Sequence, residues 1–372
     1  MAPSVLAAMA RPTIGHLDPA FIRVMDEVRT MLQAVFGTAN RLTMPMSGTG
    51  SAGMEAAIVN LVEPGDVVLV GVNGVFGGRM CEVARRAGAE VLRVEAPWGR
   101  SLDPQDFVRA AGGRAVRLLC VVHAETSTGV LQDLSGFRDA ADVVGALLLI
   151  DSVTSLGGVP VELDRFGVDV AYSGTQKCLS CPPGLAPLSA SARAVERIQA
   201  RSDAPRSWYL DLSLLTTYWL GNDGGGRAYH HTAPINMVYA LHEALRIALD
   251  EGLNARFARH QSISRGLRAG LEAMGLELPV AAVDRLPQLT LVRVPDGIDE
   301  AAVRRHLLAE YGLEIGGGLG AFAGSAWRIG LMGSGCTEAN ARLCVSAIAG
   351  ALRALGREVG DPVPALEAAL GV

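Results

Sequence analysis

The sequence carries a single lysine, Lys177, among its 372 residues. It lies in the segment YSGTQKCLSCPPG of residues 172–184, directly after an apolar run that is typical of a strand. A lysine amine at the end of a strand can act as a nucleophile or a base. The flanking Cys178 and Cys181 form an isolated C-x-x-C pair, whereas a zinc site needs a second pair or histidines at short spacing. These residues leave three roles for Lys177: a surface charge, a partner of the cysteines, or a nucleophile.

Two further segments could cooperate with such a lysine. Asp151 ends the apolar pattern of residues 146–151, and open α/β folds bind ligands at the carboxyl ends of their strands. The glycine-rich residues 46–53 open into an apolar helix, whose free amides suit a phosphate, although the lysine of a Walker loop is missing. A turn-capping aspartate and a flexible helix start are the ordinary alternatives. Together with Lys177, however, these are the groups that pyridoxal phosphate (PLP) needs.

The pattern of apolar residues predicts an α/β fold in the first half of the chain. Short, continuously apolar runs alternate with helical patterns between residue 40 and about residue 190, which indicates a mainly parallel, buried sheet. Two long helical patterns follow, and the remaining pattern up to residue 356 predicts a smaller α+β domain with an antiparallel sheet. We expect strands at residues 67–71, 90–95, 116–123, 146–151 and 168–174, and the long helices at residues 235–253 and 254–275.

Composition argues against several classes of function. The net charge is −5 and like charges do not cluster, so we expect neither a nucleic-acid partner nor an anionic membrane surface. The apolar runs are far shorter than the roughly 20 residues that cross a bilayer. We also expect no signal peptide and no peroxisomal address. The six cysteines are scattered, which is typical of a reduced, cytoplasmic protein.

Several motifs resemble one family over nearly the whole chain. Besides the segments around Asp151 and Lys177 and the glycine-rich loop, they are IGHLDPAFIRVMDEV, GVNGVFGGR, HAETSTGVLQDL, YHHTAPINMVYAL, GGLG and WRIGLMG. With them the chain resembles the class V, fold-type-I PLP-dependent aminotransferases, most of all the alanine–glyoxylate and serine–glyoxylate (serine–pyruvate) enzymes. The resemblance implies a large PLP-binding domain at residues 13–251 with a mainly parallel seven-stranded sheet. It also implies a smaller C-terminal α+β domain at residues 252–372, with residues 1–12 packed beside it.

The resemblance also implies roles for individual residues. Lys177 forms the Schiff base with PLP, Asp151 pairs with the pyridine nitrogen, and Arg328 binds the substrate carboxylate. Tyr229 and Thr232 reach the phosphate of the neighbouring subunit, so that a homodimer completes the site. The other implied contacts are Gly50, Ser51 and Gln176 on the phosphate, Thr126 near the ring hydroxyl, Val153 and Phe76 on the ring faces, and Gly15 and His16 at the substrate entrance.

Two features depart from the family pattern. Phe76 stands where close relatives carry a tryptophan stacked on the cofactor ring, and a phenyl face can still pack there. Relatives also begin with an arm that ends in a PGPSN-like segment and packs on the partner subunit. In the relatives this arm directly precedes the segment that corresponds to residues 2–6 of this chain. The sequence has no counterpart of the arm before those residues, so we hypothesise that Met1 is a misplaced start. A stop codon directly upstream of Met1 would contradict that hypothesis.

The activity that the resemblance implies is a ping-pong transamination. The donor is a small amino acid, serine or alanine, and the acceptor is glyoxylate or pyruvate. Lys177 serves as the general base, so we do not expect His123 or Glu125 to transfer protons. Two alternatives stay open: another class V aminotransferase with a specialised donor (ureidoglycine, aminoethylphosphonate or a biosynthetic amine), and a degenerate protein without catalysis. A desulfurase would need a mobile loop cysteine, and the position of Cys336, after the strand of Arg328, does not fit such a loop.

Overall fold

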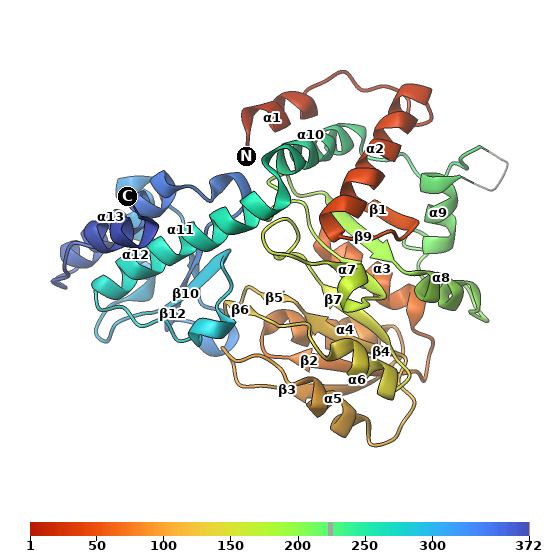
Figure 1. Cartoon of the computed structure of the whole chain (residues 1–372), viewed down its shortest axis with the longest axis horizontal. Helices are drawn as coiled ribbons and strands as arrows, with labels where there is room; N and C mark the ends of the chain where they lie inside the picture. Colours follow the sequence, from red (N-terminus) through yellow and green to blue (C-terminus); the bar gives the residue numbers. More distant parts are fainter. Residues whose placement is uncertain (222–225, 372) are drawn as a thin grey trace.

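The structure is a computed structural model that describes residues 1–221 and 226–371. Its centre is a seven-stranded sheet in the order β1-β9-β8-β7-β4-β2-β3, drawn in Figure 1. Strands β8, β7, β4, β2 and β3 run parallel, and β9 runs antiparallel to both of its neighbours, which confirms the predicted α/β class. The strands are β1 (Leu42–Ser47), β2 (Val67–Val72), β3 (Glu90–Glu95), β4 (Leu118–Val122), β7 (Leu147–Asp151), β8 (Val170–Tyr172) and β9 (Leu185–Ala190).

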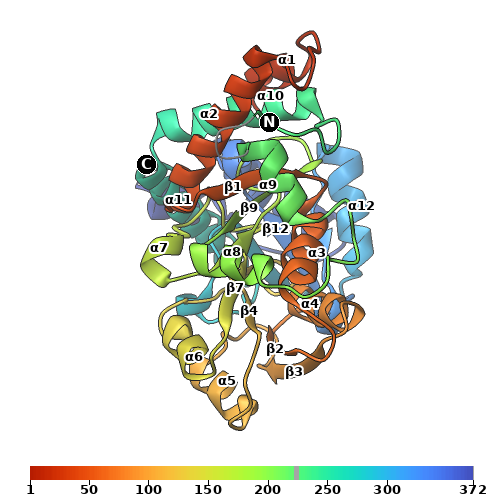
Figure 2. The ribbon, with the colours of Figure 1, turned by 90° about the vertical axis from the view of Figure 1, so that its right-hand side faces the viewer.

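The central strands are covered on both faces, which explains their continuously apolar sequences. Every residue of β4 and β7 is buried. The edge strand β3 instead exposes Glu90, Arg93 and Glu95, and charges on an edge strand disfavour pairing with another chain. In Figure 2, one side of the central strands carries α3 (Gly50–Leu61) and α4 (Val75–Arg86), and the other carries α6 (Phe137–Val143) and α7 (Leu163–Phe166).

The N-terminal segment was predicted to pack beside the small domain, whereas its helix packs against the large domain. Helix α1 (Pro3–Met9) contacts α10 (Ile235–Glu251), which precedes the predicted boundary. The Asn236 side chain donates hydrogen bonds of 2.8 Å to the carbonyls of Met9 and Arg11. Within the described part of the chain, no helix is both long and apolar enough to span a membrane. The other helices of this part are α2 (Pro19–Phe36), α5 (Pro104–Ala111), α8 (Ala192–Gln199) and α9 (Leu212–Leu220).

The C-terminal part forms a second, smaller unit. Its three-stranded sheet has the order β10-β12-β11 and is antiparallel, as predicted. Figure 1 shows α11 leaving the end of α10 and entering this unit. Buried apolar residues form one large cluster between Val5 and Leu245 and another between Ile263 and Leu366; the predicted boundary after residue 251 lies between them and stays a prediction. The elements are α11 (Leu253–Ala273), β10 (Leu289–Arg293), α12 (Glu300–Tyr311), β11 (Gly316–Gly317), β12 (Ala326–Gly330), α13 (Glu338–Ala354) and α14 (Val363–Leu370).

Three parallel strands end side by side at one edge of the sheet. Asp151, the last residue of β7, is in register with Val122 of β4 and with Tyr172 of β8. The loops that leave these ends carry Thr126 and Lys177, among other residues. In open α/β sheets, ligands bind outside the carboxyl ends of the strands. The fold therefore brings the predicted acid and the predicted lysine to the edge where a ligand is expected.

Candidate active site

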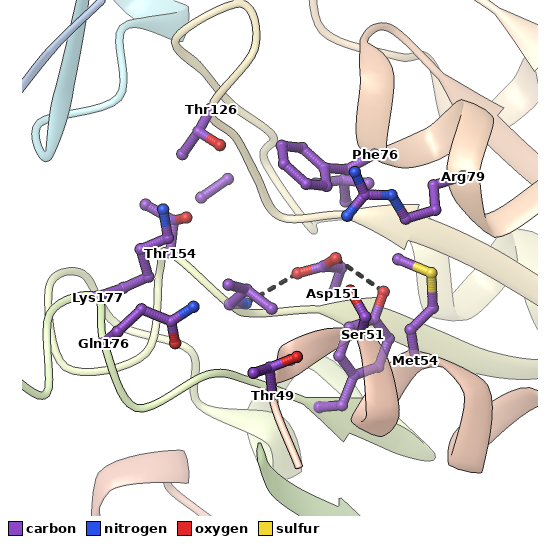
Figure 3. A pocket seen from close by; sticks show the side chains of 15 residues that line it. Thr49, Ser51, Met54, Phe76, Arg79, Thr126, Asp151, Thr154, Gln176 and Lys177 are labelled. Atoms are coloured by element: carbon purple, nitrogen blue, oxygen red, sulfur yellow. Dashed lines mark hydrogen bonds between the residues drawn. The ribbon is translucent and has the colours of Figure 1, made fainter. Parts of the chain in front are cut away.

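A cavity of about 160 Å³ opens at this edge, between the strand ends, α3 and α4. Figure 3 looks into it and shows Lys177 and Gln176 on one side, with Phe76 and Arg79 on the other. Most residues with a predicted role lie on its wall, as expected. These are Gly50, Ser51, Phe76, Thr126, Asp151, Val153, Gln176 and Lys177. Its other wall residues are Thr49, Met54, Arg79, Val122, Ala124, Thr154 and Tyr172.

Lys177 reaches the cavity from the turn after β8. It is half-buried, and its ε-amine has no hydrogen bond or ion pair with any residue that the structure describes. Burial and the nearby Arg328 lower the pKa of Lys177, while Cys178 and Asp151 act in the opposite direction. A lowered pKa increases the fraction of neutral amine, which is the nucleophilic form. The geometry therefore favours the role of nucleophile for this lysine over that of a surface charge.

The two cysteines beside Lys177 are inert. Both Cys178 and Cys181 are buried, and burial raises the pKa of each thiol to about 12, so both are neutral at ordinary pH. The Cys178 thiol donates a 3.3 Å hydrogen bond to the Thr154 carbonyl. Among the described residues, no cluster of histidines, cysteines and carboxylates could hold a metal ion. The C-x-x-C pair thus packs the loop that carries Lys177.

Asp151 is a buried carboxylate with both oxygens held. One oxygen accepts a 2.8 Å hydrogen bond from the Val153 amide, and the other accepts a 2.7 Å bond from the Tyr172 hydroxyl. Burial raises the pKa of Asp151 to about 6, against the opposing effect of these two donors. Each carboxylate oxygen can accept a further hydrogen bond, so a protonated ring nitrogen in the cavity would find an acceptor. This arrangement fits the predicted pairing with a pyridine nitrogen.

The start of α3 is an open cradle for an anion. The first amides of a helix have no partner within the helix, and the Thr49 side chain does not cap them. Gly50 packs closely against the loops of the site, because an added Cβ atom would lie 2.9 Å from the Val153 side chain and 3.4 Å from the Ser173 carbonyl oxygen. With Ser51 on the same wall, these donors suit a phosphate. Amine, acid and phosphate cradle thus all fit PLP.

Arg328, on β12, adjoins this cavity from the smaller unit. Its guanidinium donates to the carbonyls of Gly317, at 2.8 Å, and Thr126, at 3.3 Å. Burial lowers its pKa, although Glu125 acts in the opposite direction. Both hydrogen-bond partners are neutral, so the guanidinium can still bind a carboxylate bidentately. This placement fits the predicted clamp for the substrate carboxylate beside Lys177.

His123 and Glu125 have structural surroundings. Glu125 is fully buried and accepts hydrogen bonds from the Ser127 amide and hydroxyl and from the Phe76 amide, at 3.0, 2.6 and 3.0 Å. It thereby fixes the start of α4 and the Phe76 ring on the cavity wall. Burial lowers the pKa of His123 to about 4, so this ring is neutral at ordinary pH. Neither side chain is placed for proton transfer with a substrate at Lys177.

Four predicted residues do not face this cavity. His16 lies 3.0 Å from the Tyr218 hydroxyl, and its ring centroid is 5.0 Å from that of Tyr229. Tyr229 is 63% exposed, and Thr232 and Gly15 are exposed as well. Their predicted roles at the entrance and on a neighbouring subunit therefore stay predictions. Cys336 is also away from the wall: it is buried, and burial raises its thiol pKa to about 11, which does not favour a desulfurase.

Seven wall residues were not anticipated from the sequence, and two of them, Arg79 and Tyr172, contact predicted site residues. The Arg79 guanidinium lies over the Phe76 ring, with 4.8 Å between its central carbon and the ring centroid. A helix that includes Phe76 places a residue three positions later on the same face, and this spacing is the signal that points to Arg79. Tyr172 ends the strand beside Asp151, so aligning the two predicted strand ends would have found it.

Comparison with known proteins agrees with this geometry. The family model described as aminotransferase class-V matches residues 4–330. The alanine–glyoxylate aminotransferase of Drosophila melanogaster is 41% identical, covering 90% of this chain and 85% of that protein. The crystal structure of an alanine–glyoxylate aminotransferase from Nostoc sp. matches with a TM-score of 0.92 and 48% identity, over 95% of this chain and 92% of that one.

A second kind of relative is similar to about the same degree. The crystal structure of the ureidoglycine–glyoxylate aminotransferase from Bacillus subtilis matches with a TM-score of 0.96 and 39% identity, over 100% of this chain and 96% of that one. These similarities extend over nearly the whole chain and agree with the amine, the acid and the anion cradle of the cavity. The chain therefore belongs to the class V aminotransferases, the PLP-dependent enzymes that share its fold-type-I architecture.

Proposed function

We propose that this protein transfers the amino group of alanine or serine to glyoxylate, with PLP bound at Lys177. The observation that carries the proposal is the convergence of Lys177, Asp151 and the start of α3 on one cavity, with Arg328 beside it. When bound, PLP supplies the electron sink for the carbanion of the amino acid. The phosphate would rest on the amides of Gly50 and Ser51, and the ring would lie against Phe76.

Lys177, Asp151 and Arg328 would each have a separate role in such a reaction. Lys177 would hold the cofactor, and its amine, when free and neutral, would take up the proton that leaves the α-carbon of the amino acid. Asp151 would keep a proton on the ring nitrogen of the cofactor, because a carboxylate in a buried site is a strong acceptor. Arg328 orients the substrate through its carboxylate, so that the α-carbon lies within reach of the Lys177 amine.

A small, neutral side chain on the donor agrees with the wall near Lys177. That side of the cavity carries Thr126, Thr154 and Gln176, which bear no charge, and Arg328 donates a hydrogen bond to the Thr126 carbonyl from the smaller unit. Arg79 lies across the cavity in Figure 3, beside Phe76. Alanine and serine suit this surface. Ureidoglycine is a second candidate, because the ureidoglycine–glyoxylate relatives are about as similar to this chain as the alanine–glyoxylate relatives. The names of both kinds of relative include glyoxylate.

We also propose a homodimer whose two sites are shared, in a reduced, cytoplasmic setting. Tyr229 and Trp208 are 63% and 61% exposed, and Thr232, which lies close to Tyr229 in sequence, is exposed as well. Exposed aromatic residues of this size are typical of protein interfaces. These side chains do not line the cavity of their own chain, which supports a contribution to a neighbouring one. The six unpaired, buried cysteines support the reduced setting.

The test is a half-reaction followed by visible absorption. The purified protein with PLP is given L-alanine, L-serine, glycine or (S)-ureidoglycine without any oxo acid, and glyoxylate is added afterwards. We expect L-alanine or L-serine to convert the absorption band to that of the amine form of the cofactor, and glyoxylate to restore it. The Lys177→Ala variant should bind PLP without this conversion. A band that changes only with (S)-ureidoglycine would select the second candidate, and a band that no donor changes would refute the proposal.

A further inference from the structure

One buried arginine joins the two loops that carry Lys177 and Asp151. Arg256, in the first turn of α11, is 3% exposed. Its Nε atom donates to the Gly157 carbonyl at 2.9 Å, and its Nη2 atom donates to the Cys178 carbonyl at 2.5 Å. Gly157 lies in the loop that follows Asp151, and Cys178 directly follows Lys177. A single guanidinium plane therefore spans the loop of the acid and the loop of the amine.

The same arginine is anchored at the junction of α10 and α11. Its Nη1 atom donates to Glu251, the last residue of α10, at 2.6 Å. Glu251 also accepts two hydrogen bonds from Arg259, at 2.6 and 3.0 Å. Arg259 in turn donates to the carbonyls of Gly333 and Cys336, at 3.0 and 2.5 Å. The Arg256 guanidinium thus has a charged anchor on one side and two carbonyls of the site on the other.

The loop of Lys177 is also held from the smaller unit. The Ser334 amide donates a 2.8 Å hydrogen bond to the hydroxyl of Ser180, whose φ of 56° lies in the left-handed region. That conformation is strained for serine and persists only where the surroundings hold it. Gly333 permits this contact, because a Cβ atom there would lie 1.9 Å from the Ser180 hydroxyl. The loop that carries Gly333 follows β12, the strand of Arg328, so contacts from the smaller unit converge on the amine-bearing loop.

We propose that Arg256 is a positioning residue that sets the Lys177 amine relative to the Asp151 carboxylate. The inference rests on the proposed attachment of PLP to Lys177. If Asp151 and the start of α3 hold the ring and the phosphate as proposed, the lysine loop would decide whether the amine meets the aldehyde. A structural role alone would affect every ligand of the cavity equally. A positioning role affects the ligand that must react with the amine, and spares one that only fills the cavity.

The experiment compares two ligands on cofactor-free protein. PLP forms a bond to Lys177 with loss of water, whereas pyridoxamine phosphate has an amine in place of the aldehyde and cannot form it. For Arg256→Gln we expect the dissociation constant of PLP to rise about tenfold or more, and that of pyridoxamine phosphate to change less than about threefold. The half-reaction with the best donor should slow by roughly a hundredfold. Added guanidinium ion at millimolar concentration should restore part of the PLP affinity.

A matched control removes another arginine from the same helix. Arg268 donates a 2.7 Å hydrogen bond to the Leu286 carbonyl and touches neither site loop, so Arg268→Gln should leave the ratio of the two dissociation constants unchanged. The inference would be overturned if Arg256→Gln changed the dissociation constants of PLP and pyridoxamine phosphate by the same factor. It would also be overturned if the ratio of these two constants were the same in Arg256→Gln and Arg268→Gln. If Arg256→Gln does not fold, Arg256→Lys keeps the charge beside Glu251 but cannot bridge both carbonyls, and it is measured in the same way.

The wild-type protein separates this inference from the proposed function. A wild-type protein that binds both ligands but never forms the covalent bond at Lys177 would refute the proposed function, and the inference with it. A wild-type protein that forms the bond, together with an Arg256→Gln variant that forms it at the same rate and affinity, would refute the inference alone.

Discussion

Asp151 shows at the scale of one residue how function opposes stability. A carboxylate buried among apolar strands is costly to ionise, and burial raises the pKa of Asp151 from its ordinary value to about 6. The pKa of Asp151 in the folded state lies above its value in the unfolded chain. The contribution of Asp151 to the free energy of unfolding is therefore fully present below about pH 4. It is lost as the pH rises through about 6. At neutral pH the cofactor-free protein therefore holds a charge that destabilises it.

Asp151→Asn should consequently stabilise the cofactor-free protein at alkaline pH while it removes the proton acceptor for the ring nitrogen. We expect a gain in the free energy of unfolding of up to about 3 kcal/mol at pH 8 and almost none at pH 4. Urea unfolding of both proteins at the two pH values measures the difference. An equal gain at both pH values would show that the ionisation of Asp151 has no part in the effect.

The apolar pattern placed Lys177 and Asp151 in the site, and the family resemblance added residues such as Arg328, but neither pointed to Arg256. Lys177 and Asp151 could be predicted because each directly follows or ends an apolar strand, and such ends align in a parallel sheet. Arg256 could not, because it lies 99 residues from Gly157 and 78 residues from Cys178. Contacts of this kind depend on how α11 docks onto the site loops, and no local pattern encodes that docking.

At the scale of the elements, the apolar pattern predicted five strands of the large sheet and missed two. The missed strands, β1 and β9, contain Pro45 and Pro187, and proline is disfavoured within sheets because it has no amide hydrogen. The structure pairs these two prolines opposite each other, so neither strand loses a donor that its partner could use. The Pro187 carbonyl still accepts a 2.7 Å hydrogen bond from the Ser173 amide. Local propensity was overridden by pairing at long range.

The helices of the smaller unit were easier to predict, because their ends carry local signals. Asp299 caps α12 by accepting hydrogen bonds from the amides of Ala301 and Ala302. Gly312 ends it in the left-handed conformation that glycine adopts readily. Where the ends of a helix depend on a capping residue and on a terminating glycine, the sequence alone is enough to predict them.

At the scale of the whole molecule, the central question is whether two chains share each site. Tyr229 and Thr232 were predicted to reach the phosphate of a neighbouring subunit, and in one chain they face outward. A shared site makes a specific prediction for mixed dimers. Lys177→Ala removes the amine of its own cavity, whereas a Tyr229→Ala/Thr232→Ala double variant damages the cavity of its partner.

Co-expression of these two inactive chains should therefore restore activity. Random pairing gives hybrids with one intact site each, so we expect about a quarter of the wild-type activity, well above that of either variant alone. Transamination of the best donor with glyoxylate, measured on the purified mixture, tests this. Activity equal to the mean of the two parents would mean that each chain builds its site alone.

The most direct test of the account is to locate the bond between protein and cofactor. The protein with PLP is reduced with borohydride, digested and analysed by mass spectrometry. Because Lys177 is the only lysine, the chain amino terminus is the one other primary amine available, and the two are easily distinguished. We predict one reduced cofactor per chain on the peptide that contains Lys177, and its loss when an amino donor is added before reduction. A label on the amino terminus, or no label at all, would contradict the account.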